Sequence, residues 1–299
     1  MTINIKKAAT PDRVTSKVCE VCGKSRAEIY LNVTGLSQDS GSKYTLVKCS
    51  ECGLISLHPR PSSAEIAAYY SDNDPERVPR KPAFYEKLYF SFFRNIPLKK
   101  KGTLLDIGCG SGRYIYVMRD LGWQVKGIDI TPTEYGKKEL GLDIHEGDLL
   151  KANFPDESFD AVTLWWALEH IDEPMPFLKE AYRILKKGGV LLVGVPNIDS
   201  REAHLFKKYW FHLFLPRHVQ HFTPVTLTTA LKAAGFGRVK IRSDIFSFGI
   251  IGSLQNYLND KGIKISLKNP FFYILSLPLD MVLGIGNKGG LMTAYAFKE

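Results

Sequence analysis

Apolar and polar residues follow different periods in different parts of the chain. From residue 104 to residue 245, short apolar runs alternate with stretches whose apolar residues recur at helical spacing. The runs predict strands at 104–107, 124–130, 142–147, 159–166, 188–196 and 238–243, and the stretches between them predict helices at 111–121, 174–185 and 226–234. This order predicts a parallel sheet with helices on both of its faces.

The regions on either side have patterns of their own. Ser62 and Glu65 have the spacing of a capping box and predict a helix, and residues 82–95 predict a second helix whose aromatic residues pack on a wide apolar face. Residues 246–290 form an apolar insertion that also carries lysines, which predicts a helical cap on the domain. The alternation at the end of the chain predicts a last strand within 291–299.

Composition places the chain among ordinary globular proteins. Its 299 residues are 44% hydrophobic and 24% charged, which excludes disorder, a collagen-like repeat and a disulfide mini-protein. No apolar run reaches the roughly 18 residues of a membrane span, and the first residues lack the apolar segment of a signal peptide. We therefore expect a cytoplasmic protein.

The net charge of +9 is unevenly distributed. It amounts to +7 over residues 1–103, −6 over 104–200 and +8 over 201–299. Basic flanks predict contact with an anionic partner such as nucleic acid, a phosphorylated small molecule or a membrane surface. The alternative is that these lysines and arginines only keep the protein in solution.

Four of the five cysteines form two close pairs. Two residues separate Cys19 from Cys22 and Cys49 from Cys52, and a glycine follows each pair. A cytoplasmic location disfavours disulfides, whereas four thiolates complete the tetrahedral coordination of a structural Zn²⁺ and leave no open position for catalysis. The pairs therefore predict a zinc-binding module at residues 1–60.

With this module the chain divides into five segments. They are the zinc-binding module at 1–60, a helical linker or lid at 61–103, the sheet-forming core at 104–245, the cap at 246–290 and the last strand at 291–299.

A glycine-rich loop follows the first predicted strand of the core. The sequence LLDIGCGSG places Asp106 at the strand end and Gly108 and Gly110 in the turn before a helix. NAD-binding folds use a similar loop, but the spacing here is one residue short of theirs, and a carboxylate at Asp106 would repel a pyrophosphate and attract a cation. Asp129 ends the second strand, where a carboxylate can accept hydrogen bonds from both ribose hydroxyls.

These motifs, together with EGDLL at 146–150 and FDAVTLWWALEHI at 159–171, resemble the class I S-adenosylmethionine-dependent methyltransferases. The resemblance implies an α/β fold with a seven-stranded, doubly wound, Rossmann-like sheet, whose last strand runs antiparallel beside the fifth. It also implies S-adenosylmethionine as the cofactor, with Asp148 accepting from the adenine amino group. The implied pocket residues are Asp106, Gly108, Gly110, Asp129, Ile130, Asp148 and Leu149.

Three histidines are candidate catalytic bases. Methyl transfer from a sulfonium requires alignment and, for some acceptors, removal of a proton. His170 follows the fourth strand of the core, and His218 and His221 lie in the sequence PRHVQHFTP. For each of them the alternative is a packed or pocket-lining residue. Arg217, next to His218, is a candidate for holding a phosphate or carboxylate.

The stretch around these histidines, together with the cysteine pairs, resembles a bacterial subgroup of these methyltransferases. Its members act on small molecules, including sugars of surface glycans, nucleotide-linked sugars and quinone-type rings. We therefore expect methylation of a hydroxyl or carbon of a small molecule, anionic or sugar-containing, such as a lipid-linked precursor. The insertion at 246–290 adds the hypothesis of peripheral contact with the inner face of the membrane.

Two other functions stay open. An RNA methyltransferase would use the zinc module and the basic flanks to bind phosphates. The strand end WWALEH lacks the Asn/Asp-Pro-Pro-Tyr/Phe signature of amine methylation, and basic and aromatic residues are little interleaved, so nucleic acid is the less favoured partner. A non-catalytic scaffold would bind the cofactor without turnover and recruit a partner through the zinc module.

Overall fold

The structure is a computed structural model that describes residues 18–34, 43–61, 79–244, 247–267 and 269–299. The helix predicted to begin at Ser62 lies outside the described residues.

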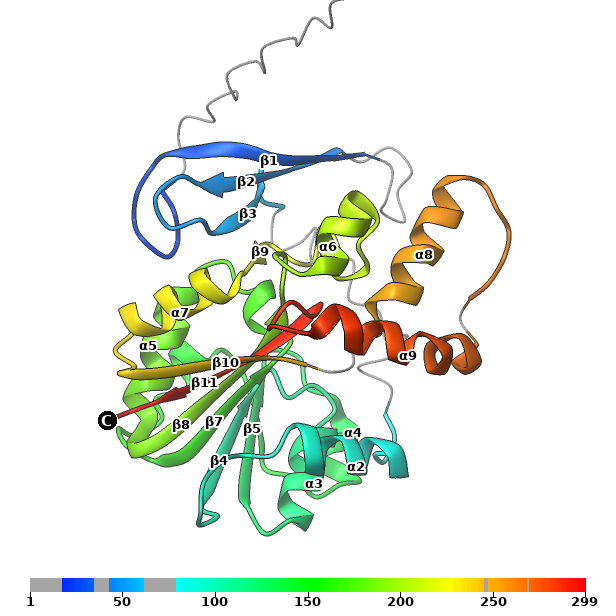
Figure 1. The fold of residues 1–299 in the computed structure, drawn as a ribbon. Helices are drawn as coiled ribbons and strands as arrows, with labels where there is room; N and C mark the ends of the chain where they lie inside the picture. Colours follow the sequence, from blue (N-terminus) through cyan, green and yellow to red (C-terminus); the bar gives the residue numbers. More distant parts are fainter. Residues whose placement is uncertain (1–17, 35–42, 62–78, 245–246, 268) are drawn as a thin grey trace, which may run out of the picture.

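A seven-stranded sheet forms the centre of the molecule (Figure 1), in the order β10-β11-β8-β7-β4-β5-β6. The strands β4 to β8 pair in parallel, whereas β11 is antiparallel to both β8 and β10. Their bounds are Thr103–Ile107 for β4, Gln124–Asp129 for β5, Ile144–Glu146 for β6, Phe159–Trp165 for β7, Leu185–Pro196 for β8, Arg238–Ser243 for β10 and Leu291–Phe297 for β11. This confirms the predicted fold, including the last strand beside the fifth strand of the core.

Helices cover both faces of this sheet because its strands are apolar on both sides. Along β8, Leu191 and Val193 join one hydrophobic cluster and Val190 and Leu192 join the other. Buried residues of α5 and α7 complete the first cluster, and buried residues of α3 complete the second. The helices of the core are α2 (Phe84–Phe93), α3 (Arg113–Asp120), α4 (Glu134–Lys138), α5 (Pro174–Ile184) and α7 (Pro224–Ala233).

The predicted packing of the helix at 82–95 is wrong for most of its aromatic residues. None of the residues of α2 is buried, and Phe84 and Phe92 are about three-quarters exposed, at 77% and 75%. The helix packs on α3 through a few contacts, such as the edge-to-face contact between the Phe90 and Tyr114 rings. Its remaining apolar face has no described element packed over it, so these aromatic residues form surface rather than core.

A second, antiparallel sheet lies above the main one in Figure 1, in the order β1-β2-β3-β9. Its first three strands, β1 (Ala27–Thr34), β2 (Lys43–Cys49) and β3 (Ile55–His58), come from the N-terminal region. The fourth, β9 (Gln220–His221), belongs to the histidine-rich stretch of the core and pairs with β3. Residues 1–60 therefore do not make this sheet alone, and the sheet is joined directly to the stretch that carries the candidate bases.

The helices α6 (Arg201–Phe206), α8 (Gly249–Asp260) and α9 (Pro270–Gly284) lie beside the two sheets (Figure 1). Short 3₁₀ turns occur at η1 (Leu149–Lys151), η2 (Leu168–His170), η3 (Lys207–Tyr209) and η4 (Phe211–Leu213). No described helix is both long and apolar enough to cross a bilayer.

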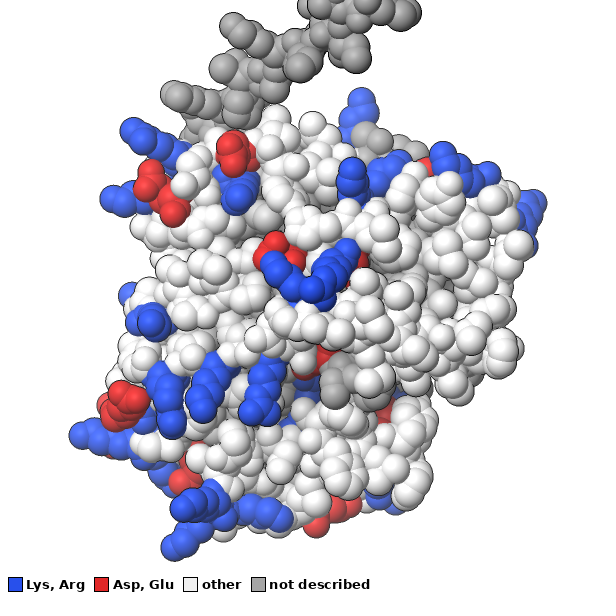
Figure 2. Space-filling model, viewed as in Figure 1, with Lys and Arg blue, Asp and Glu red and all other residues white. Residues whose placement is uncertain are grey.

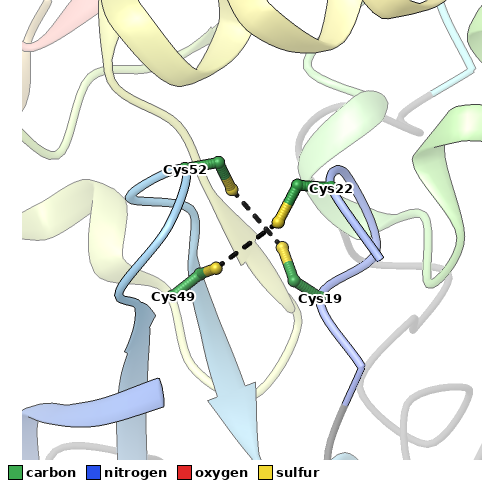
Figure 3. Close-up of side chains that lie close together, drawn as sticks. All are labelled: Cys19, Cys22, Cys49 and Cys52. Atoms are coloured by element: carbon green, nitrogen blue, oxygen red, sulfur yellow. Dashed lines mark hydrogen bonds between the residues drawn. The ribbon is translucent and has the colours of Figure 1, made fainter. Parts of the chain in front are cut away.

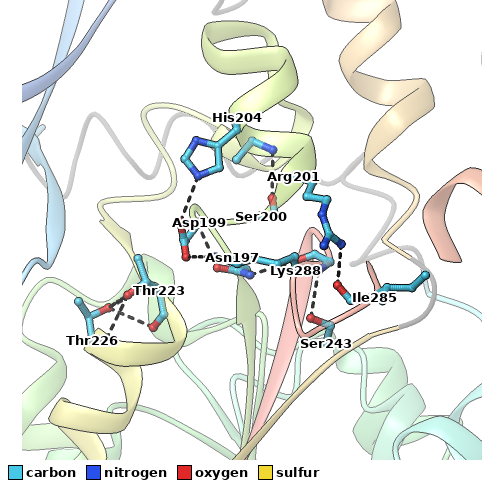
Figure 4. Close-up of polar contacts among 12 residues, drawn as sticks. Asn197, Asp199, Ser200, Arg201, His204, Thr223, Thr226, Ser243, Ile285 and Lys288 are labelled. Atoms are coloured by element: carbon cyan, nitrogen blue, oxygen red, sulfur yellow. Dashed lines mark hydrogen bonds and ion pairs between the residues drawn. The ribbon is translucent and has the colours of Figure 1, made fainter. Parts of the chain in front are cut away.

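Polar contacts fasten α9 to α6 (Figure 4). Arg201, at the start of α6, donates to the carbonyl oxygens of Leu283 and Ile285 at the end of α9, over 2.8 and 2.6 Å. Nearby, Lys288 pairs with Asp199 at 2.6 Å. A guanidinium at the C-terminus of a helix satisfies carbonyl groups that have no partner within the helix, so this end of α9 is held in place.

Candidate functional site

The carboxyl end of β4 carries a buried acid. Asp106 is 3% exposed, and the Thr163 hydroxyl of the neighbouring strand β7 donates to its Oδ1 over 2.6 Å. Burial, together with the nearby charge of Asp129, raises the pKa of Asp106 to about 7. A cation bound next to this carboxyl would lower that pKa again and be attracted in return.

The loop after β4 turns sharply and leaves little room for side chains. Gly108 has φ +75°, and a Cβ added to it would lie 2.9 Å from the Cβ of Ala167, just before η2. The amides of Gly108 and Cys109 both donate to the carbonyl oxygen of Ile128 in β5, over 2.8 and 3.2 Å. The loop is thus fixed to the next strand and pressed against the end of β7, which exposes backbone at the position that the sequence predicts for the cofactor.

Asp129, at the end of β5, is oriented by two backbone amides. Gly110 donates to its Oδ2 over 2.8 Å and Thr131 donates to its Oδ1 over 2.9 Å. Each carboxylate oxygen can accept more than one hydrogen bond, so both remain able to accept from a diol. The glycine loop and Asp129 therefore form one unit.

The other predicted cofactor residues follow the neighbouring strand ends. Ile130, directly after β5, is 70% exposed. Asp148 caps the short turn η1 by accepting from the amide of Leu150 over 3.0 Å. Leu149 is buried in a core cluster, and the exposed apolar side chain beside Asp148 is that of Leu150.

Two of the three predicted histidines meet at the end of β7. The ring of His170, in η2, lies 4.7 Å from the ring of His218, measured between centroids. Glu169, a residue that the sequence analysis overlooked, completes the group. One carboxylate oxygen of Glu169 and one ring nitrogen of each histidine all lie within 4.8 Å of one another.

His221 is set apart from this group. Its side chain is buried in β9, its ring lies 6.3 Å from that of His218, and burial lowers its pKa to about 3. Burial also lowers the pKa of His218, which places His218 among neutral imidazoles at physiological pH.

The four paired cysteines converge at one point (Figure 3). The Sγ atoms of Cys19 and Cys52 lie 3.5 Å apart and those of Cys22 and Cys49 lie 3.6 Å apart, and all four lie within 4.8 Å of one another. These separations are far longer than the roughly 2.05 Å of a disulfide. They are close to the roughly 3.8 Å between thiolates in a tetrahedron with Zn–S distances of about 2.3 Å.

Both cysteine pairs sit in the same kind of turn. Gly23 donates to the carbonyl of Cys19 over 2.8 Å, and Gly53 donates to that of Cys49 over 2.9 Å. The two glycines have φ +70° and φ +79°, a conformation that favours glycine. The glycine after each pair is therefore required by the turn that aims two thiols at one position.

Arg94 is a second feature that no sequence motif marked. It is 1% exposed, and its guanidinium donates to Asp244 and to Thr293, each over 2.7 Å. It also stacks over the rings of Trp165 and Trp166 at 4.6 and 4.9 Å. This cluster ties the end of α2 to β10, β11 and the end of β7, next to the glycine loop.

Comparison with known proteins decides the family. A family model described as a methyltransferase domain matches residues 81–241, more than half of the chain. The chain belongs to the class I S-adenosylmethionine-dependent methyltransferases. The segment that the model matches contains the glycine loop, Asp129 and the Glu169–His170 pair.

The proteins to which this methyltransferase is similar are named for different activities. A probable S-adenosylmethionine-dependent methyltransferase of Mycolicibacterium smegmatis is 30% identical over 140 residues, which are 44% of this chain and 51% of the relative. A demethylmenaquinone methyltransferase of Deinococcus radiodurans is 29% identical over 177 residues, 50% of this chain and 72% of the relative. The chain thus spans about half the length of the first relative.

Among solved structures, phosphoethanolamine N-methyltransferase 2 of Haemonchus contortus has a similar fold. The likeness covers 96% of this chain and 71% of that chain, with a TM-score of 0.50 and 16% sequence identity.

Proposed function

We propose that this methyltransferase binds S-adenosylmethionine across the carboxyl ends of β4 and β5 and methylates a hydroxyl or carbon of a small molecule. The observation that carries the proposal is the pair of carboxyl groups, Asp106 and Asp129, on the two sides of one glycine loop. Asp129 faces the ribose hydroxyls as a double acceptor, and Asp106 lies beside the cationic amino-acid end. Bound S-adenosylmethionine supplies an electrophilic methyl group.

The adenine is held by the strand ends that follow. In this proposal Asp148 accepts from the amino group of the ring, and the exposed side chains of Ile130 and Leu150 cover its faces. Leu149 supports this region from the core. Gly108 and Gly110 let the ligand lie close to the backbone, because neither residue has a side chain.

We further propose that Cys19, Cys22, Cys49 and Cys52 hold a structural zinc ion. The donor set and its spacing support this assignment. The ion would stabilise a sheet whose strand β3 pairs with β9, and the amide of Leu57 donates to the carbonyl of Val219 over 3.0 Å. In this proposal the zinc ion stabilises the segment that carries His218. A structural role of this kind favours a small-molecule methyltransferase over an RNA methyltransferase.

The acceptor binds against the group formed by Glu169, His170 and His218, beyond the glycine loop. These side chains can align an acceptor hydroxyl and take up its proton, directly or through a bound cation. The Deinococcus relative is named for a quinone substrate. Both that name and the apolar surface of α9 are consistent with one kind of acceptor. It would be a ring or sugar that bears hydroxyl groups and is attached to a lipid or an anionic group.

An apolar surface on α9 supports a lipid-linked acceptor. Figure 2 shows the face around α9 almost free of charged side chains, with Lys and Arg along the rim near α8. The exposed apolar residues of this helix and its end are Phe271, Ile274, Leu275, Leu279, Met281, Val282 and Ile285. Apolar area with a basic rim is suited to the surface of an anionic bilayer.

The test of this proposal uses the two phases of a cell extract. We expect release of S-adenosylhomocysteine to rise when the lipid phase or the sugar-nucleotide fraction of the aqueous phase is added, and not with buffer alone.

A second test measures binding to anionic vesicles by flotation. The wild type should float with the vesicles, whereas the Ile274→Asp variant should stay in solution. The matched control is Val225→Asp, at an exposed valine of α7, which should float as the wild type does. No release with either phase would contradict the acceptor, and no flotation would contradict the bilayer contact.

A further inference from the structure

Strand β10 lies at one edge of the seven-stranded sheet and presents a row of basic side chains. Arg238, Lys240 and Arg242 are exposed, whereas Val239 and Ile241 between them pack against the core. Because alternate residues of a strand point to the same face, the three cations lie in one line, about 7 Å apart. Figure 2 shows Lys and Arg side chains side by side over the position that β10 occupies in Figure 1.

No described carboxylate forms an ion pair with any of these three cations. The carboxylate of Glu299 lies close to Gly237, at the start of the row, but does not pair with Arg238. The residues of β11 that lie opposite the row are uncharged: Phe297, Tyr295 and Thr293. Like charges at this spacing repel each other, because the screening length in physiological salt is about 8 Å. An anionic partner would relieve this repulsion.

The two arginines of the row are held flat against aromatic rings. The guanidinium carbon of Arg238 lies 4.1 Å from the centroid of the Phe297 ring, and that of Arg242 lies 5.9 Å from the centroid of Tyr295. Stacking fixes the plane of a guanidinium and leaves its N–H groups able to bind a phosphate or carboxylate with two hydrogen bonds. Lysines alone would discourage pairing of this edge with another sheet, but they would not provide such oriented donors.

The row points toward the edge of the sheet that carries the glycine loop. Strand β10 is antiparallel to β11, which is antiparallel to β8, so β10 runs in the same direction as β4 and β8. Asp244, directly after β10, pairs with Arg94 at 2.7 Å, and Arg94 stacks over Trp166 at the end of β7. Four strand spacings of about 4.8 Å separate β10 from β4, which amounts to about 19 Å. A ligand that contacts both the row and the glycine loop is therefore elongated.

We propose that Arg238, Lys240 and Arg242 bind the anionic part of an elongated acceptor, a chain of linked units with repeated phosphate or carboxylate groups. This inference rests on the proposed function, because it assigns the row to the acceptor. The methylated unit lies at the glycine loop, and the charged units extend along β10.

Two other anionic partners fit the row less well. A bilayer presents a plane of phosphates and is bound by basic residues around an apolar area, as on α9, whereas these cations form a single line. Single-stranded RNA is bound by aromatic faces on which bases stack. Here Arg238 and Arg242 cover the outer faces of Phe297 and Tyr295, whose rings also pack against the core.

The test measures binding of two soluble chains, polyphosphate and oligogalacturonate, to the full-length protein by calorimetry. The two probes distinguish a phosphate chain from a carboxylate chain, and neither requires cofactor or turnover. Combined replacement of Arg238, Lys240 and Arg242 by Gln should weaken binding of the preferred chain at least tenfold. It should also lower the slope of log affinity against log salt by about one for each cation removed.

The matched control replaces three exposed lysines outside the row, Lys99, Lys100 and Lys101, by Gln. It removes the same charge and should bind the chain within twofold of the wild type. Unchanged S-adenosylmethionine affinity shows that each variant is folded. If the combined variant fails this check, Arg238→Gln and Arg242→Gln, tested singly, decide.

The proposal is overturned if the wild type binds neither chain at low salt, or if the row variant and the control bind equally well. Tighter binding of single-stranded RNA through the same row would assign it to nucleic acid. Binding of anionic vesicles through the row, without either soluble chain, would assign it to the bilayer. Chain binding with no methyl transfer to any acceptor would refute the proposed function alone, whereas methyl transfer without chain binding would refute only the role of the row.

Discussion

The backbone amide of Gly110 donates to Oδ2 of Asp129 over 2.8 Å. This bond joins the glycine loop after β4 to the end of β5, and the amide of Thr131 holds the other oxygen of the same carboxylate. The acid is thereby fixed before any ligand arrives, so little side-chain entropy has to be lost on binding. If the ribose binds here as proposed, this preorganisation predicts that Asp129 is a particularly sensitive position for cofactor affinity.

Asp129→Ala should weaken S-adenosylmethionine binding by about 1.5–3 kcal/mol, because it removes a charged acceptor from two hydroxyls. Isothermal titration calorimetry measures this change directly. The matched control is Asp143→Ala, which removes an exposed acid that pairs with Lys126 on the surface. Equal affinities of wild type and Asp129→Ala would contradict the placement of the ribose.

Cofactor affinity should rise with pH around neutrality. Burial raises the pKa of Asp106 to about 7, so below that pH the free protein holds a proton that a cationic ligand must displace. Between pH 8 and pH 6 we expect an affinity loss of up to about tenfold, with proton release on binding at the lower pH. Asp106→Asn should bind more weakly and lose this part of the pH dependence. A wild type with the same pH profile as Asp106→Asn would refute a cation beside Asp106.

Stability should respond to pH through a second buried acid, Glu202 of α6. The hydroxyl of Ser247 lies 2.5 Å from Glu202 and 3.0 Å from Asp280. Burial raises the pKa of Glu202 to about 7, with the charge of Asp280 as a further cause. A raised pKa means that the folded protein holds the proton more tightly than the unfolded chain. The stabilisation is complete below the unfolded pKa of about 4.3 and is lost as pH rises through 7.

We therefore expect the free energy of unfolding of Glu202→Gln, relative to that of the wild type, to increase by about 3 kcal/mol from pH 5 to pH 8. Urea unfolding at both pH values measures the difference. Glu173→Gln, at an exposed glutamate, should show no such change. A constant difference between wild type and Glu202→Gln would show that Glu202 does not titrate in this range.

Cys19→Ser should cost the protein one zinc equivalent and loosen the N-terminal sheet, while the seven-stranded sheet stays folded. Elemental analysis gives the zinc content, and hydrogen exchange of β2 and β3 reports the sheet. Because β3 pairs with β9, the amides around His221 should exchange faster as well. Cys109→Ser, a buried cysteine outside the cluster, should keep its zinc. Full zinc content in Cys19→Ser would refute the four-cysteine site.

Much of the core could be predicted because its signals are local. Continuous apolar strands, helices of amphipathic period and a glycine loop each lie within a few residues, and the order of these elements determines a parallel sheet. The same holds for the cysteine pairs, whose turns need only a glycine after each pair. Both the fold and the convergence of Cys19, Cys22, Cys49 and Cys52 follow from such short segments.

The features that sequence reasoning missed depend on contacts between distant residues. Strand β9 has two residues, too few for any pattern, and exists because β3 lies beside it. Glu169 gains its role from His218, and Arg94 is buried only because Asp244 and Thr293 receive its guanidinium. The prediction that the aromatic residues of α2 are packed was wrong for a different reason. An apolar helix face does not specify whether another element covers it.

The measurement that tests the central claim most directly uses S-adenosylmethionine labelled in its transferable methyl group. The purified protein is incubated with cell extract, and the products are divided into RNA, lipid, glycan and small-metabolite fractions. We predict label in the lipid, glycan or metabolite fraction, and at least about tenfold less label there with Asp129→Ala when the cofactor concentration is below the dissociation constant of the wild type. Label confined to RNA would contradict this account and make the zinc module and the basic flanks a nucleic-acid-binding surface.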